Sequence, residues 1–156
     1  MEIKELGHIV LYVREIERSV RFYRDVLGWR QILPGDGEQA VRAPFAAFSA
    51  PSGRTHHELL LIEVGKDAAA QPEGRRVGLY HFGLKVGDSD DELREALARL
   101  TETGTPVVGA SDHTVTHSLY ITDPDGNEIE LYIDVPGVDW RSDPTLVGTP
   151  TKPLHL

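Results

Sequence analysis

Two histidines and one glutamate occupy short stretches of the sequence in which apolar and polar residues alternate. His8 is the second residue of "GHIVLYV", and His81 is the second residue of the similar stretch "YHFGLKV". Glu130 lies in a third such stretch, "NEIELYIDV". Two imidazoles and one carboxylate form a ligand set that suits a divalent metal and leaves coordination positions open for water, substrate or oxygen.

The alternation in these stretches is typical of β-strands with one apolar face, and it places the three candidate ligands on the opposite face. If the strands pair into one curved sheet, the three side chains can converge in its hollow. A carboxylate buried alone is unstable, and a bound cation removes that penalty. The sequence therefore predicts a metal site at His8, His81 and Glu130. Taken singly, each has an ordinary explanation, since a strand histidine is commonly a hydrogen-bonded core or rim residue and a strand glutamate is commonly solvated.

The elements that must position these residues follow the same order in both halves of the chain. A helix is expected after each histidine strand, over residues 15–28 and over residues 89–104, where Ser89 and Glu92 form a capping box. Three extended segments then follow each helix: 29–33, 46–49 and 58–64 in the first half, and 107–108, 118–122 and 129–135 in the second.

This repetition predicts the fold class and the division of the chain. We expect an α+β protein built from two tandem βαβββ modules, residues 1–66 and 79–135, within one structural domain. Residues 67–78 form a polar linker, and residues 136–156, rich in proline and glycine, form an extended C-terminal tail.

The composition excludes several classes of function. The formal net charge of -9 and the isoelectric point of about 5.2 disfavour nucleic acid and membrane surfaces as partners. The absence of cysteine excludes disulfides, thiolate metal sites and a cysteine nucleophile. The first residues lack the pattern of a signal peptide, and no apolar stretch is long enough to span a bilayer. We therefore expect a soluble, cytoplasmic protein.

The repeated pattern, with "GHIVLYV", "RSVRFYRDVLGW", "GLYHFGLKV" and "DPDGNEIELY", resembles the vicinal oxygen chelate superfamily of glyoxalase I, bleomycin and fosfomycin resistance proteins and extradiol dioxygenases. The resemblance covers residues 5 to 135. It implies an open, cup-shaped mixed sheet with helices on the outside and a metal inside. It also implies that His8, His81 and Glu130 hold the metal, Fe(II) first, with Mn(II), Zn(II) or Ni(II) as alternatives.

Within the superfamily, the second half resembles bacterial catechol 2,3-dioxygenases. The extradiol signature is matched by residues of 113–130, although Ser111 departs from the residue types that usually open it. The resemblance implies that His113 and Tyr120 contact substrate and bound oxygen. "RTHHELLL" resembles the stretch that carries the acid–base histidine, which assigns that role to His57. The alternative is that His57 belongs to a solvated loop.

The resemblance leaves other functions open. A glyoxalase needs a carboxylate ligand on the strand over 58–64, at the position equivalent to Glu130. When the two halves are aligned by their turns that position is His57, and when they are aligned by their apolar runs it is Leu59; in both alignments Glu58 points the other way. An isomerase, epimerase or thiol transferase would use the same three ligands, and an antibiotic-sequestering protein would need none. For the dioxygenase the partners are a catechol-like small molecule and O2. Members of the superfamily are often dimers, so a homodimer is a further possible partner arrangement for this chain. We expect surface positions for the remaining histidines, which are His56, His117 and His155.

Overall fold

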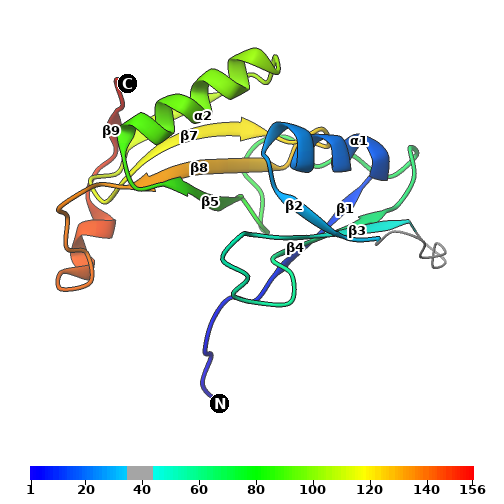
Figure 1. Cartoon of the computed structure of the whole chain (residues 1–156), viewed down its shortest axis with the longest axis horizontal. Coiled ribbons are helices and arrows are strands. Elements are labelled where there is room, and N and C mark those ends of the chain that lie inside the picture. The colour runs from blue at the N-terminus through cyan, green and yellow to red at the C-terminus, as the bar shows by residue number, and fades with distance from the viewer. Residues whose placement is uncertain (35–43) are drawn as a thin grey trace. The chain divides into compact units, whose positions relative to one another are not determined.

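The computed structural model describes residues 1–34 and 44–156, which form two compact units, Met1–Gln71 and Pro72–Leu156. Each unit consists of one β-sheet with a helix packed against one of its faces (Figure 1). Each contains a strand, a helix and three further strands in that order. The predicted α+β fold with two βαβββ modules is therefore confirmed.

The first unit has a four-stranded sheet in the order β1-β4-β3-β2. The pairing of β1 with β4 is parallel, and the other two pairings are antiparallel. The helix over 16–26 ends before Gly28, whose φ of 73° is a conformation that favours glycine. The elements are β1 (Ile9–Val13), α1 (Ile16–Arg21), the π-helical turn η1 (Phe22–Val26), β2 (Arg30–Leu33), β3 (Phe45–Ser49) and β4 (Leu59–Glu63).

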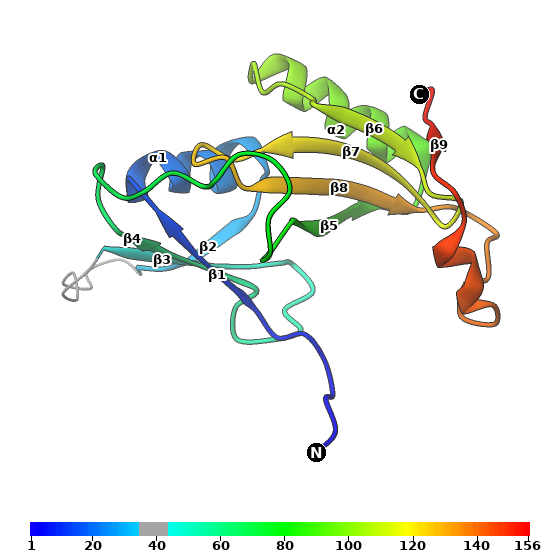
Figure 2. The same ribbon diagram turned by 180° about the vertical axis from the view of Figure 1, so that it is seen from behind.

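The second unit has a five-stranded sheet in the order β5-β8-β7-β6-β9. Its β5–β8 pairing is parallel, like that of β1 with β4, and its other pairings are antiparallel. Figure 2 shows the short strand β9 lying beside β6. The elements are β5 (His81–Gly87), α2 (Asp90–Glu102), β6 (Gly109–Asp112), β7 (Thr116–Thr122), β8 (Glu128–Asp134), the 3-10 helix η2 (Pro144–Gly148) and β9 (Lys152–Pro153).

The alternating pattern of the strands divides each sheet into a core face and a polar face. In β8, Ile129, Leu131 and Ile133 are buried, whereas Glu128 and Glu130 lie on the other face and are partly exposed. Burial of each such apolar side chain contributes about 1.5–3 kcal/mol. The core of both units comprises fully buried side chains such as Tyr23, Phe48, Leu59, Leu61, Leu93, Leu100, Ile121 and Ile129. The candidate functional side chains of β8 therefore lie on its polar face, away from the core.

Three elements differ from the sequence-based expectation. The strand expected at 107–108 lies at Gly109–Asp112, because pairing with β7 determines its position and its glycine and polar residues show no apolar alternation. The first helix changes to π-helical geometry at Phe22. The tail is not wholly extended, since it forms η2 and then adds β9 to the sheet. None of the helices in the described ranges has the length and apolar character required to cross a bilayer.

The capping box that begins α2 is present. The Ser89 hydroxyl accepts a hydrogen bond from the Glu92 N–H, and the Glu92 carboxylate accepts hydrogen bonds from the Asp88 N–H and the Ser89 hydroxyl. Gly87 permits this close packing, since a Cβ there would lie 2.5 Å from Glu92 Cβ. The hydrogen bond from the Asp88 N–H, followed by that from the Ser89 hydroxyl, lowers the pKa of Glu92 below its usual 4.5.

The replacement Glu92→Gln should flatten the dependence of stability on pH in acid. A carboxyl whose pKa is lower in the folded state stabilises the fold above its unfolded pKa of 4.5, and the stabilisation disappears as the pH falls through the folded value. Melting temperatures measured from pH 6 down to about pH 3 should therefore fall more steeply for the unaltered protein than for the variant. Parallel curves for the two proteins would contradict the assignment.

Candidate metal centre and its polar network

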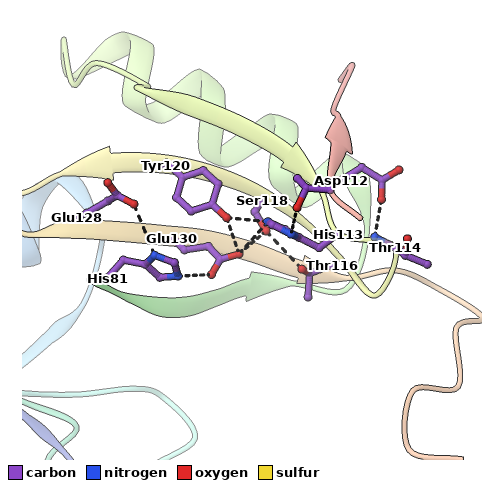
Figure 3. A network of polar contacts seen from close by, with 10 residues as sticks. His81, Asp112, His113, Thr114, Thr116, Ser118, Tyr120, Glu128 and Glu130 are labelled. Atoms are coloured by element: carbon purple, nitrogen blue, oxygen red, sulfur yellow. Dashed lines mark hydrogen bonds and ion pairs between the residues drawn. The ribbon is translucent and has the colours of Figure 1, made fainter. Parts of the chain in front are cut away.

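His81 and Glu130 lie close together on the polar face of the second unit. The parallel pairing of β5 with β8 sets His81 opposite Glu128 and Gly83 opposite Glu130. His81 Nε2 is 3.3 Å from Glu130 Oε2, as Figure 3 shows. Gly83 leaves the space beside this pair open, since a Cβ there would lie 3.5 Å from Glu130 Oε2 and 3.2 Å from the Tyr132 ring.

The second oxygen of Glu130 is held by two hydroxyl groups of β7. Ser118 donates a hydrogen bond of 2.6 Å to Glu130 Oε1, and Tyr120 donates one of 3.3 Å to the same atom. Ser118 is fully buried, and the Glu130 side chain is only 16% exposed. These donors fix the orientation of the carboxylate, so that Oε2 remains directed at His81.

His113 lies on the turn between β6 and β7, and the backbone of that turn is strained. Thr114 has a φ of 72°, which is unfavourable for a β-branched residue. The Asp112 carboxylate stabilises this conformation by accepting a hydrogen bond of 2.6 Å from the Thr114 N–H. The turn directs His113 toward Tyr120, whose hydroxyl oxygen is 2.7 Å from His113 Nε2 (Figure 3).

The hydrogen bonds from the tail to Glu130 form one directed chain. Because the Tyr120 hydroxyl donates to Glu130, its oxygen accepts a hydrogen bond from the protonated Nε2 of His113. In the neutral ring with its proton on Nε2, Nδ1 is the acceptor, and Thr151 Oγ1 lies 3.3 Å from it. Thr151 immediately precedes β9, so the C-terminal strand brings a hydroxyl group to the outer nitrogen of His113.

The surroundings of Tyr120 favour its neutral form. Burial raises the pKa of Tyr120 well above its usual value of 10, and the adjacent Glu130 carboxylate raises it further. The Glu128 carboxylate likewise raises the pKa of Tyr80 through its charge and a hydrogen bond. Tyr120 therefore remains a hydrogen-bond donor throughout the neutral and mildly alkaline range.

The replacement Thr151→Val should change the tautomer balance of His113. It removes the hydroxyl from Nδ1 at nearly constant volume, and one net hydrogen bond of about 0.5–1.5 kcal/mol corresponds to roughly a two- to tenfold shift in tautomer ratio. The imidazole 15N chemical shifts of His113 measure that ratio. The Thr151→Ser variant, which keeps the hydroxyl, should match the unaltered protein; identical spectra for all three would exclude the contact in solution.

The donor atoms of His81 and Glu130 fit a bound divalent metal. Two atoms at about 2.1 Å from one ion and at right angles to each other lie about 3 Å apart, close to the separation of this pair. His81 Nδ1 is buried and has no hydrogen-bond partner, with Glu128 Oε1 at 3.5 Å. A carboxylate at the outer nitrogen of a metal-binding histidine typically orients the ring. Glu128 is placed for that role.

The first unit carries His8 and His57 side by side. The Ile9 N–H donates a hydrogen bond of 2.8 Å to the Glu58 carbonyl, which brings the residues that precede β1 and β4 together. The rings of His8 and His57 have centroids 4.6 Å apart. Burial lowers the pKa of His57 below its usual 6.5, and the neighbouring His56 and His8 lower it further. His57 is therefore neutral at pH 7 and able to accept a proton.

The predicted site residues are thus distributed over both units. His81, Glu130, His113 and Tyr120 meet in the second unit, and His8 and His57 meet in the first. The joining of His8 to the His81–Glu130 pair stays a prediction. Sequence reasoning missed Ser118, Glu128 and Thr151; of these, the parity of Glu128 with Glu130 in β8 was a usable signal.

The expected surface position is found for His56, which is exposed and whose Nδ1 lies 2.6 Å from His57 Nδ1. The same expectation was wrong for His117. His117 is half-buried on the helix side of β7, with its Nδ1 2.6 Å from Asp90 Oδ1. The pattern of the sequence could not reveal either partner, because neither follows from strand alternation.

Comparison with known proteins places these features in a family. Residues 5–131 match the model of the Glyoxalase/Bleomycin resistance protein/Dioxygenase superfamily. A catechol-2,3-dioxygenase of Bacillus subtilis (strain 168) is 38% identical over 142 residues, which are 91% of this chain and 46% of that protein. An iron-dependent extradiol dioxygenase of Rhodococcus jostii (strain RHA1) is 31% identical over 81% of this chain and 42% of its own length. The chain therefore spans less than half of these two relatives.

A solved structure shows the same fold at lower sequence identity. The glyoxylase/bleomycin resistance protein/dioxygenase domain from Frankia sp. EAN1pec superposes with a TM-score of 0.70. It is 20% identical, and the match covers 90% of this chain and 99% of that one. The family match spans most of both βαβββ modules and includes all six predicted site positions, from His8 to Glu130. The chain belongs to the glyoxalase/bleomycin resistance protein/dioxygenase superfamily.

Proposed function

We propose that this protein is a metal-dependent extradiol dioxygenase that opens the ring of a catechol-like substrate next to its two hydroxyl groups. The proposal rests on one observation above others: His81 Nε2 and Glu130 Oε2 form a ligand-like pair, and His113 and Tyr120 lie directly beside it. The proposed ligand set is completed by His8. The 38% identity to a catechol-2,3-dioxygenase supports this reaction, although the chain spans 46% of that relative.

Fe(II) is the proposed metal, because two imidazoles and one carboxylate with open positions suit non-haem iron. When bound, it would supply a centre that holds the diol and oxygen in contact and passes electron density between them. The name of the iron-dependent relative in Rhodococcus jostii supports this choice. Glu128 would orient the His81 ring, and the two hydroxyl groups on Glu130 Oε1 would keep its other oxygen directed at the metal.

The remaining residues are proposed to move or hold protons. His57 is neutral at pH 7 because burial lowers its pKa, so it can accept a proton from a substrate hydroxyl. Tyr120 keeps its proton because burial and Glu130 raise its pKa. Its single O–H is directed at Glu130 Oε1 and is proposed to turn to a reacting oxygen atom when substrate binds. His113 holds the Tyr120 hydroxyl in place through Nε2.

The test is a ring-cleavage assay on protein loaded with Fe(II) without air. Addition of air and a panel of catechols should give the yellow ring-fission product with matching uptake of O2. Absence of product over a broad panel, with metal content and fold verified, would overturn the proposal. The panel should include catechols with small and with bulky substituents.

Two alternative functions predict different results. A glyoxalase, isomerase or thiol transferase would work with air-stable Zn(II), Ni(II) or Co(II) and take up no O2. Against Glu58, which immediately precedes β4, as the carboxylate ligand of a glyoxalase, its Oε2 already accepts a hydrogen bond of 2.8 Å from the Ala50 N–H. A protein that only sequesters an antibiotic would keep its ligand affinity in the His81→Ala variant, whereas either enzyme would lose activity.

A further inference from the structure

Three histidines of the first unit are close enough to bind one cation. His8, His56 and His57 each offer a ring nitrogen, and these three atoms lie within 4.8 Å of one another. The ring centroids are separated by 4.4 to 5.7 Å. Three imidazoles around one Zn(II) at about 2.0–2.1 Å have nitrogens about 3.3 Å apart. Because His8 and His56 are exposed, small rotations of their rings would close the difference.

The hydrogen bonding of these rings is incomplete without a cation. His57 Nε2 is buried and has no hydrogen-bond partner. His56 Nδ1 and His57 Nδ1 lie 2.6 Å apart, so only one of the two can carry a proton between them. The other nitrogen presents a lone pair, as a metal ligand must. A shared cation would therefore give the ring nitrogens of these three imidazoles partners that they do not find in one another.

We propose that His8, His56 and His57 form a second cation site, which binds Zn(II), Cu(II), Ni(II) or Co(II) and withdraws His8 from the ligand set with His81 and Glu130. Nitrogen donors bind these ions more tightly than Fe(II), following the usual order of divalent metals. The site contains no carboxylate, which distinguishes it from the pair in the second unit. Binding of a cation at the three histidines does not depend on the proposed dioxygenase reaction. The consequence that such a cation inhibits ring cleavage, by withdrawing His8 from the iron, rests on that proposed function.

The site is tested in a variant that lacks both ligands of the second unit, His81→Ala/Glu130→Gln. Titration with Co(II), followed by visible absorption, should show one bound ion per chain, and Zn(II) should displace it. Adding His56→Gln removes a direct ligand, so the affinity should fall by more than the roughly 10–100-fold typical for loss of an outer partner. Adding His155→Gln instead, at an exposed position in the tail, provides the matched control and should leave the affinity unchanged.

The outcomes separate this inference from the proposed function. If the double variant keeps its fold and binds no Co(II), or if His56→Gln and His155→Gln behave alike, the three-histidine site is excluded. If the double variant does not fold, the same comparison is made in Glu130→Gln alone. Zinc added to otherwise unaltered protein should displace Fe(II) less readily after His56→Gln; equal displacement would exclude the withdrawal of His8. Ring cleavage without Co(II) binding would overturn only this inference, and Co(II) binding without ring cleavage only the proposed function.

Discussion

The Glu130→Gln variant should lose its bound iron and its ring-cleaving activity. The replacement removes the negative charge and offers an amide where Oε2 lies 3.3 Å from His81 Nε2. It also leaves Ser118 and Tyr120 with a weaker acceptor in place of Oε1. Loss of an outer partner of a metal ligand already costs about 10–100-fold in metal affinity or activity, so removal of a charged ligand should exceed about 100-fold. Iron content by elemental analysis and initial rates of O2 uptake measure the two effects.

The matched control is Glu128→Gln, two residues away on the same face of the same strand. Glu128 lies 3.5 Å from His81 Nδ1 and has no place in the proposed ligand set. Its replacement should weaken metal binding by about 10–100-fold and leave activity recoverable at saturating iron. If both variants kept full iron content, Glu130 would not be a ligand, and the site in the second unit would be a hydrogen-bonded network only.

The second large effect is expected for His57→Gln, which should lower kcat by about 100- to 10,000-fold, the usual contribution of general acid–base catalysis. Glutamine keeps a polar side chain of similar reach but cannot accept a proton at neutral pH. Because His57 is not a ligand in the proposed iron site, the iron content should be unchanged. Single-turnover rates under saturating catechol, with iron measured on the same sample, separate catalysis from metal loading.

The control for this variant is His155→Gln, which alters a histidine in the exposed tail and should leave kcat unaffected. A His57→Gln protein that retained full kcat would assign the proton transfer to another group. His57 would then be a residue of the loop before β4 with no catalytic role, which is the alternative interpretation given for it from the sequence.

The fold and the positions of several residues on the polar faces of the sheets could be predicted from the sequence, because both depend on the alternation of apolar and polar residues. The alternation of β8 predicted that Ile129 and Ile133 are buried and that Glu130 faces away from the core, and both are found. The repeat showed that His8 and His81 occupy equivalent positions in the two halves, and the capping box located the start of α2 at Ser89. Such features are local, since one strand or one helix turn contains all the residues concerned.

The partners supplied by other elements could not be predicted. Ser118 is a small polar residue in a strand of mixed composition, and its hydrogen bond to Glu130 depends on the register of β7 against β8. Thr151 reaches His113 only because residues 152–153 join the edge of the sheet. His56 meets His8 because β1 runs parallel to β4, a pairing between segments about fifty residues apart, and such long-range pairings leave little trace in a single sequence.

Strand β9 has a practical consequence for any shortened form of this protein. It is short, but it covers Ser111 and Asp112 of β6, which would otherwise be the outer strand on that side of the sheet. A fragment ending after η2 would keep His81, Glu130, His113 and Tyr120, yet leave those backbone groups without partners. Bare sheet edges recruit strands from other molecules. Aggregates or dimers formed by such a fragment would therefore result from the exposed edge of β6 and would not indicate how the intact chain associates.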